Sequence, residues 1–258
     1  MPMDMQHFNS SGIGLAFIDE GAGEATEPPV LLIHGFASNV AANWVDPGWV
    51  RTLRRAGHRV IGLDNRGHGQ SEKLYDEAAY TPRLMAEDAR ALLDHLGIER
   101  AHVMGYSMGA RVTAFLALAH PARVRSAVFG GLGANMVRGL AGARPIAKAM
   151  LQPRIEDVTN AAARTFRAFA DATHSDLRAM AACVVGSREA MPAELVAQIA
   201  VPVLVAVGEL DVIGGPAAEL AAMIPGAEAY VIEGRDHMKA VGDFKFKEAV
   251  VAWLARHG

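Results

Sequence analysis

Short apolar runs and helical patterns alternate along most of this sequence. Continuous apolar runs of strand length are typical of parallel strands that are buried on both faces of a sheet. Such runs occur at residues 30–33, 59–63, 101–104, 124–129, 201–207 and 227–232. Between them, apolar residues recur at helical spacing, as at 49–56, 82–96, 108–119 and 243–256. Residues 6–19 instead predict a hairpin around a turn rich in Asn, Ser and Gly. The pattern therefore predicts an α/β fold, with an eight-stranded, mostly parallel sheet and helices on both faces.

The alternation stops between residues 134 and 199. This segment holds no strand-like run, and its apolar residues predict helices at roughly 140–151, 155–171, 175–185 and 192–199. An alanine-rich helical segment of this size would struggle to bury a core of its own. We therefore predict a helical cap insertion at 134–199, carried by a core domain made of residues 1–133 and 200–258.

A G-x-S-x-G element lies where one predicted strand meets one predicted helix. Gly105-Tyr106-Ser107-Met108-Gly109 follows the apolar run 101–104 and precedes the helix 108–119. This strand–turn–helix context gives the motif its chemical meaning. Glycines on either side would remove side chains that collide at a tight turn, and the serine backbone would be strained. The first amide of the following helix would then point to where an oxyanion could form.

A serine hydroxyl needs a base to take its proton, and the base needs a third group to hold its tautomer. Asp211 comes just after the run 201–207, and His237 comes just after the run 227–232. Catalytic groups of open α/β sheets collect at the carboxyl ends of strands. Glu209 and Glu233 are alternatives for the acid, but the order Ser, Asp, His is that of the α/β-hydrolases.

Several motifs carry a wider resemblance. They are HGF at 34–36, DNRGHGQS at 64–71, GYSMG at 105–109, GELD at 208–211 and the late His237. With them the sequence resembles the α/β-hydrolase superfamily over essentially its whole length, within the small, cofactor-free esterase and haloperoxidase-like branch. The resemblance implies an oxyanion hole made of the backbone N–H groups of Phe36 and Met108. Asp236 stands where family members commonly carry glycine, so the turn before His237 is expected to differ.

The resemblance implies a serine hydrolase that cleaves an ester or a related activated acyl substrate through a Ser107–His237–Asp211 triad and an acyl-enzyme. It implies no metal and no organic cofactor. A serine at 107 disfavours the branches that use aspartate there, the haloalkane dehalogenases and epoxide hydrolases. Two other readings stay open. The same triad could hydrolyse a C–C bond or perhydrolyse a carboxylic acid, or the pocket could serve a small-ligand sensor with little turnover.

Four apolar residues of the predicted cap are expected to line a substrate pocket above Ser107, because such pockets are mostly apolar. They are Met136, Phe166, Phe169 and Met180. Cations outnumber acids between residues 134 and 190. One or two of these arginines could hold a carboxylate at the pocket rim, although solvated outer faces are the more ordinary explanation.

Composition narrows the remaining functions. The chain has 258 residues, 51% of them hydrophobic, and a net charge of −3, which favours a folded protein acting on a small molecule rather than on nucleic acid. His34 and His68 lack the ligand spacing of a metal site. The single cysteine, Cys183, is expected to be a buried thiol of the core. We expect no signal peptide, no membrane span and a cytoplasmic location. No oligomeric state follows from the sequence.

Overall fold

The computed structural model describes residues 4–139 and 141–258. Residues 1–3 of the predicted core domain, and residue 140 at the start of a predicted helix, lie outside the described residues. In the described part, eight strands form one sheet in the order β1-β2-β4-β3-β5-β6-β7-β8. The strands are β1 (Gln6–Ser10), β2 (Ile13–Glu20), β3 (Glu27–Ile33), β4 (His58–Leu63), β5 (Ala101–Tyr106), β6 (Val124–Gly130), β7 (Val203–Gly208) and β8 (Glu228–Ile232).

The sheet is parallel from β4 to β8. Only β1 and β2 pair antiparallel, β1 with β2 and β2 with β4. The remaining neighbours, β4–β3, β3–β5, β5–β6, β6–β7 and β7–β8, are all parallel. The predicted eight-stranded, mostly parallel sheet is therefore confirmed. The carboxyl ends of β3, β5, β7 and β8 lie along one edge of it, where the predicted site residues follow.

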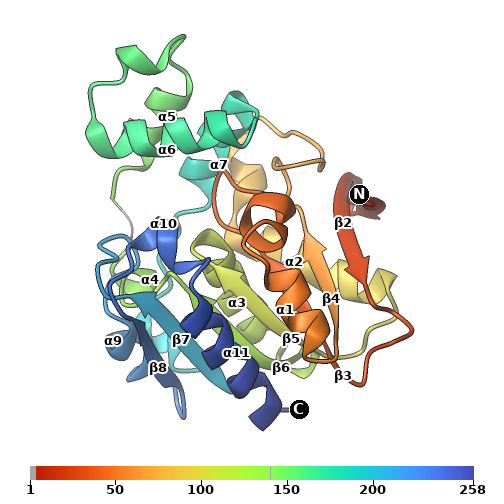
Figure 1. Ribbon diagram of the computed structural model, residues 1–258. Coiled ribbons are helices and arrows are strands. Elements are labelled where there is room, and N and C mark those ends of the chain that lie inside the picture. The colour runs from red at the N-terminus through yellow and green to blue at the C-terminus, as the bar shows by residue number, and fades with distance from the viewer. Residues whose placement is uncertain (1–3, 140) are drawn as a thin grey trace.

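Helices cover both faces of the sheet (Figure 1). Helices α1 and α11 lie on one face, and α2, α3 and α9 pack on the other. The helices are α1 (Trp49–Arg55), α2 (Pro82–His95), α3 (Met108–Ala119), α4 (Asn135–Arg138), α5 (Ala143–Met150), α6 (Ala161–Ala172), α7 (Leu177–Gly186), α8 (Ala193–Val196), α9 (Ala217–Ala221), α10 (His237–Ala240) and α11 (Phe244–Arg256). Shorter turns are a π-helical turn, η1 (Ala41–Val45), and 3₁₀ turns at η2 (Glu77–Tyr80), η3 (Pro121–Arg123) and η4 (Ile155–Asp157).

Alternation within β3 explains why both faces need helices. Leu31 and Ile33 belong to the core cluster shared with α2 and α3, whereas Val30 and Leu32 belong to the cluster shared with α1 and α11. All four side chains are fully buried. Successive strand residues point to opposite faces, so a strand covered on both sides is apolar throughout. This is the pattern by which the sequence predicted the strand.

Helices α4 to α8 lie between β6 and β7, within the predicted insertion at 134–199. Helices α5 and α6 stand beyond one end of the sheet (Figure 1). The predicted helix 155–171 is broken, because Asn160 starts α6 as its N-cap and accepts a hydrogen bond from the Ala163 amide. The end helices pack closer to the sheet, since α8 contacts α3. That this segment functions as a cap stays a prediction.

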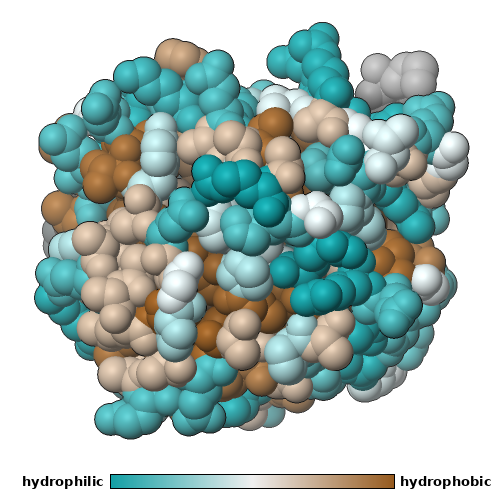
Figure 2. Space-filling model, turned by 90° about the horizontal axis from the view of Figure 1, so that it is seen from below, coloured by the Kyte–Doolittle hydropathy of each residue, from teal (hydrophilic) through white to brown (hydrophobic). Residues whose placement is uncertain are grey.

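The opposite end of the molecule is shown in Figure 2. Hydrophilic residues there surround a more apolar area on the side of α9 and β8 (Figure 2). Apolar atoms are common on the surface of folded proteins, so this area needs no functional explanation. Within the described residues, no helix combines the length and apolarity that crossing a bilayer requires.

Candidate active site

Ser107 occupies a sharp turn between β5 and α3. Its backbone has φ 55° and ψ −112°, a region that non-glycine residues seldom adopt. The flanking glycines make the turn possible. A Cβ on Gly105 would lie 2.1 Å from the carbonyl oxygen of Gly109, and one on Gly109 would lie 1.9 Å from that of Ile33. Any side chain at either position would therefore displace backbone, which explains the spacing of the motif.

The three residues predicted as a triad form a chain of contacts in space, from Ser107 to His237 to Asp211. His237 Nε2 lies 3.0 Å from Ser107 Oγ, and His237 Nδ1 lies 2.7 Å from Asp211 Oδ2. The other carboxylate oxygen of Asp211 accepts the amides of Ile213 and Gly214, at 2.9 and 2.8 Å. A carboxylate held by two amides keeps its second oxygen aimed at the imidazole. The geometry thus brings together a hydroxyl, a base and an orienting acid.

The alternative acids, Glu209 and Glu233, make their contacts away from the His237 imidazole. Glu209 Oε2 accepts the amide of Gly234, and Glu233 pairs with Lys245 Nζ at 3.2 Å on the surface. Neither carboxylate forms a hydrogen bond or ion pair with His237 in the described part of the chain. Among the acids considered from the sequence, only Asp211 contacts the imidazole.

Asp236, which stands where glycine is common before the histidine, has a structural role. Its Oδ1 accepts the amides of Met238 and Lys239, at 3.1 and 2.9 Å, so it is the N-cap of α10. His237 is therefore the first residue of a capped helical turn. Tyr106, which precedes the nucleophile, donates its hydroxyl to the His237 carbonyl at 2.6 Å. Together these contacts fix the histidine backbone from two sides.

The loop after β3 lies against the nucleophile. A Cβ on Gly35 would be 3.4 Å from the Cβ of Ser107. The backbone N–H groups of Phe36 and Met108 find no acceptor among the described residues. Met108 is the first residue of α3, where an amide has no partner within its own helix. Two unused donors on either side of Ser107 are what an oxyanion hole requires, although the role itself stays a prediction.

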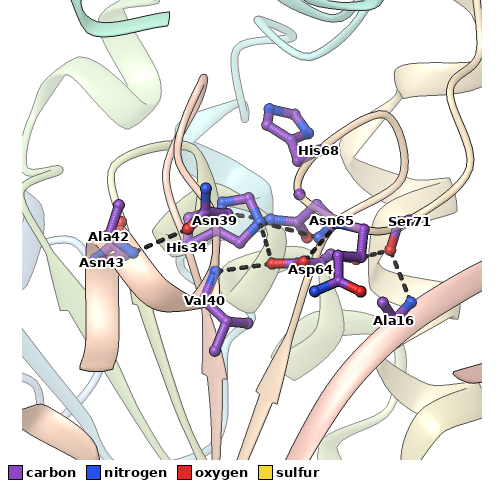
Figure 3. A network of polar contacts seen from close by, with 12 residues as sticks. Ala16, His34, Asn39, Val40, Ala42, Asn43, Asp64, Asn65, His68 and Ser71 are labelled. Atoms are coloured by element: carbon purple, nitrogen blue, oxygen red, sulfur yellow. Dashed lines mark hydrogen bonds and ion pairs between the residues drawn. The ribbon is translucent and has the colours of Figure 1, made fainter. Parts of the chain in front are cut away.

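A buried polar network holds this loop in place (Figure 3). His34 Nε2 accepts the Asn65 amide at 3.0 Å, and His68 Nε2 accepts the Ala37 amide at 3.2 Å. Each ring therefore carries its proton on Nδ1 and donates it to a carbonyl, that of Gly35 or of Arg66. Burial lowers the pKa of His34 to about 4 and, with the His34 charge as a smaller cause, that of His68 to about 3. Both histidines are thus neutral parts of the loop.

Further residues of this support were not found from the sequence. Ala37 has φ 55°, and its carbonyl accepts the Thr173 hydroxyl at 2.8 Å. Asn43, in the π-helical turn, accepts the Gly35 amide with Oδ1 at 3.1 Å. Tyr106 could have been suspected from its place beside the nucleophile. Thr173 and Asn43 carry no such signal, because their partners are backbone groups, which no side-chain pattern marks.

A cavity of about 580 Å³ opens over Ser107, His237 and Phe36. Phe166 and Phe169 line it, and the ring of Phe166 packs on that of Phe36 with centroids 5.9 Å apart. These two of the four predicted pocket residues therefore face the candidate site. A second cavity, of about 640 Å³, shares Phe166, Phe169 and Met238 with the first.

The prediction was wrong for Met136 and Met180. Both side chains have 0% exposed surface, so no molecule in either cavity can touch them. The buried Arg111 of α3 explains the position of Met136, because its guanidinium donates to the Met136 carbonyl at 3.0 Å and holds α4 on the core. Met180 belongs to the same buried cluster through α7. Helical spacing marked these residues as inward-facing without distinguishing core from pocket.

Two other candidate chemistries were a metal site and a reactive cysteine. Within residues 4–139 and 141–258, no group of three or more His, Cys, Asp or Glu side chains is arranged to hold a metal ion. Cys183 is fully buried, and burial raises the pKa of its thiol to about 12. Such a thiol stays protonated and is a poor nucleophile.

Comparison with known proteins agrees with this fold. Residues 28–141 match the model of the alpha/beta hydrolase fold. The chain is 32% identical to epoxide hydrolase B of Mycobacterium tuberculosis over 46% of its own length and 33% of that protein. It is 36% identical to 2-hydroxymuconate semialdehyde hydrolase of a Pseudomonas species, over 47% of its own length and 41% of that protein.

Solved structures extend the likeness to nearly the whole chain. A hydrolase from Pseudomonas aeruginosa superposes with a TM-score of 0.78 at 25% identity, over 98% of this chain and 99% of that one. The curated relatives match over well under half of their own length, so what they act on is not transferred here. The family model matched by residues 28–141, the shared fold and the Ser–Asp–His order all agree: the chain has the α/β-hydrolase fold.

Proposed function

We propose that the protein is a serine hydrolase that cleaves a carboxylic ester or a similarly activated acyl compound. The observation that carries the proposal is the chain of contacts from Ser107 Oγ to His237 Nε2 and from His237 Nδ1 to Asp211 Oδ2. A histidine that contacts a hydroxyl on one side and a buried carboxylate on the other can act as a general base. The adjoining cavity has room for a small-molecule substrate.

In the proposed reaction Ser107 Oγ attacks the acyl carbon while His237 Nε2 takes the hydroxyl proton. The amides of Phe36 and Met108 stabilise the oxyanion, and Asp211 stabilises the imidazolium. The bond to the leaving group then breaks, and the leaving alcohol takes the proton from His237. Water attacks the resulting acyl-enzyme with the same base, which releases the carboxylic acid and restores Ser107. We assign the helices of 134–199 to a cap over this site, with Phe166 and Phe169 as its substrate-facing residues.

The test is steady-state turnover of p-nitrophenyl butyrate by the wild type and by Ser107→Ala. We expect a loss of roughly 10⁵ or more in kcat, leaving the residual rate supplied by binding and the oxyanion hole. Ser38→Ala is the matched comparison, because Ser38 lines the same cavity and has no histidine partner in the described residues. Activity above a tenth of wild type in Ser107→Ala would refute the assignment.

Two competing functions predict different kinetics with this ester or with a diketone-like substrate. A ligand sensor built on this fold would release one burst of nitrophenol without further turnover. A C–C hydrolase would turn over a diketone-like substrate with a much higher kcat/KM than any ester of similar size. Multiple rapid turnovers of the ester support the proposed function.

A further inference from the structure

The second cavity contains a cation, Arg188, that forms no ion pair among the described residues. Its wall is mostly apolar and includes Ile146, Phe166, Phe169 and Ile213. Arg188 also lines it, half-buried, with its guanidinium carbon 5.8 Å from the centre of the Phe166 ring. One nitrogen, Nη1, donates to the Ala141 carbonyl at 2.5 Å. That contact engages one of the five N–H groups of the guanidinium.

The other cations around the two cavities are paired. Arg235 contacts Asp243 at 2.7 Å, and Lys239 lies 3.6 Å from Asp236. Arg188 forms no ion pair with any carboxylate of residues 4–139 and 141–258. Glu189, its neighbour in the chain, turns instead toward Arg83, at 3.7 Å.

Arg188 also stands near a second buried cation. Burial is the main cause that lowers the pKa of Arg111, and the charge of Arg188 adds to it. Burial likewise lowers the pKa of Arg188. The Glu189 carboxylate partly offsets the charge of Arg111, and Arg188 has no ion-pair partner in the described residues, so this end of the cavity is electrostatically positive. An anion placed there would offset the desolvation of Arg188.

The second cavity adjoins the cavity of the candidate active site. Phe166, Phe169 and Met238 line both cavities. The ring of Phe166 contacts both the Phe36 ring and the Arg188 guanidinium, so two aromatic contacts link the predicted oxyanion loop to the cation. Val212, which directly follows Asp211, also lines the second cavity and is 89% exposed. A bound apolar chain would cover this side chain.

We infer that Arg188 holds the carboxylate of a substrate whose apolar body lies between Phe166 and Val212 while its acyl carbon reaches Ser107. The substrate class is a carboxylate-bearing ester, such as the monoester of a dicarboxylic acid. This inference rests on the proposed function for the reacting end and adds a second recognition point. Guanidinium binds carboxylate through two parallel hydrogen bonds, and Arg188 has donors left for both.

The kinetic test compares pairs of p-nitrophenyl esters. In each pair the acyl chain ends in a carboxylate or in the primary amide of the same length, and the chain length is varied. We expect wild type to favour the carboxylate in kcat/KM by roughly ten- to a hundredfold at the best length, as hydrogen bonds to charged groups allow. The preference should shrink as salt rises. Equal kcat/KM values for both members at every length would overturn the inference.

Variants distinguish the effect of the Arg188 charge from that of the other cations in the segment 134–199. Arg188→Met should lose most of the preference, mainly through a higher KM for the carboxylate, while turnover of the amide-ended ester stays near wild type. Arg188→Lys should keep part of it, because it keeps the charge but not the paired donors. Arg164→Met is the matched control, since Arg164 is an exposed cation of α6 that lines neither cavity. A loss as large in Arg164→Met as in Arg188→Met would also overturn the inference.

A binding measurement keeps this inference separate from the proposed reaction. Calorimetry with 4-phenylbutyrate and 4-phenylbutyramide needs no turnover. We expect the acid to bind wild type at least about tenfold more tightly than the amide, and Arg188→Met to bind the two alike. Acid-selective binding without ester turnover would reject the hydrolase proposal and keep the anion site. Ester turnover with equal binding of acid and amide would do the reverse.

Discussion

Ser107 combines a strained backbone with a well-supported side chain. A non-glycine residue in its conformation costs roughly 1–3 kcal/mol, which the surrounding structure must supply. Backbone hydrogen bonds supply part of it, because the Ser107 amide donates to Gly130 at 2.8 Å and its carbonyl accepts the amide of Ala110 at 3.0 Å. The strain places Oγ at the tip of the turn, within reach of His237. A relaxed turn would point the hydroxyl elsewhere.

Asp211→Asn should lower kcat by roughly 10⁴, because an amide at this position favours the wrong imidazole tautomer. The fold should be unaffected, since Asn can still accept the amides of Ile213 and Gly214 through its oxygen. Steady-state kinetics with a neutral ester would measure the change.

Glu209→Gln and Glu233→Gln are the controls for this change. Both remove one negative charge close to the same strand ends, and neither side chain contacts His237. We expect each to cost less than about tenfold in kcat, as a long-range field effect across a screened surface. A loss approaching that of Asp211→Asn in either variant would mean that the acid has been misassigned.

At the scale of elements, the loops after β3 and β4 are stabilised by histidines that are buried and neutral. His34 and His68 belong to the loop network, and burial also lowers the pKa of His102, on β5, to about 3. In the unfolded chain each histidine titrates near its ordinary pKa of about 6.5. As pH falls below that value, the unfolded state takes up protons that the folded state refuses, so the free energy of unfolding falls.

We therefore expect the protein to lose stability between pH 7 and pH 5, by roughly 2 kcal/mol for each such histidine at pH 5. Urea unfolding at a series of pH values would measure this. His102→Asn tests the cause away from the candidate site, because His102 contacts Ser126 and is distant from the loops. The variant should show a shallower pH dependence by about one proton, whatever its absolute stability. An unchanged slope would contradict the explanation.

The sequence was sufficient to predict the strands, most of the longer helices and the proximity of Ser107, Asp211 and His237, because these features leave local signatures. Apolar runs mark strands buried on two faces, and Ser107, Asp211 and His237 each follow such a run. Pocket residues were predicted less well. Phe166 and Met180 both recur at helical spacing, but whether an inward-facing residue meets a cavity or the core depends on how α6 and α7 pack. The roles of Asn43 and Thr173 depend on backbone partners, Gly35 and Ala37, that no side-chain pattern reveals.

For the whole molecule, the candidate site draws on four of the eight strands of the sheet. The predicted oxyanion loop follows β3, Ser107 follows β5, Asp211 follows β7 and His237 follows β8. The π-helical turn and the end of α6 then brace the first of these loops. The site is therefore complete only when strands from both halves of the chain are paired. Its two cavities lie on the side where α6 approaches the sheet.

His237, the proposed base, follows the least protected of these strands. β8 is the last strand of the order, pairs only with β7 and leaves Val231 half exposed. Edge segments with few buried contacts open at lower free energy than the strands between them. Partial melting of β8 would withdraw His237 while β3, β5 and β6 keep their pairing.

Enzymatic activity in urea should consequently disappear at a lower concentration than helical circular dichroism does. A tightly bound substrate analogue should bring the two midpoints together, since it binds only the state in which His237 is in place. If the two curves already coincide without ligand, β8 unfolds together with the rest of the sheet. A separation would mean that one peripheral strand sets the range of temperature or denaturant in which this protein is active. Stabilising β8 would then extend that range without changing the reacting groups.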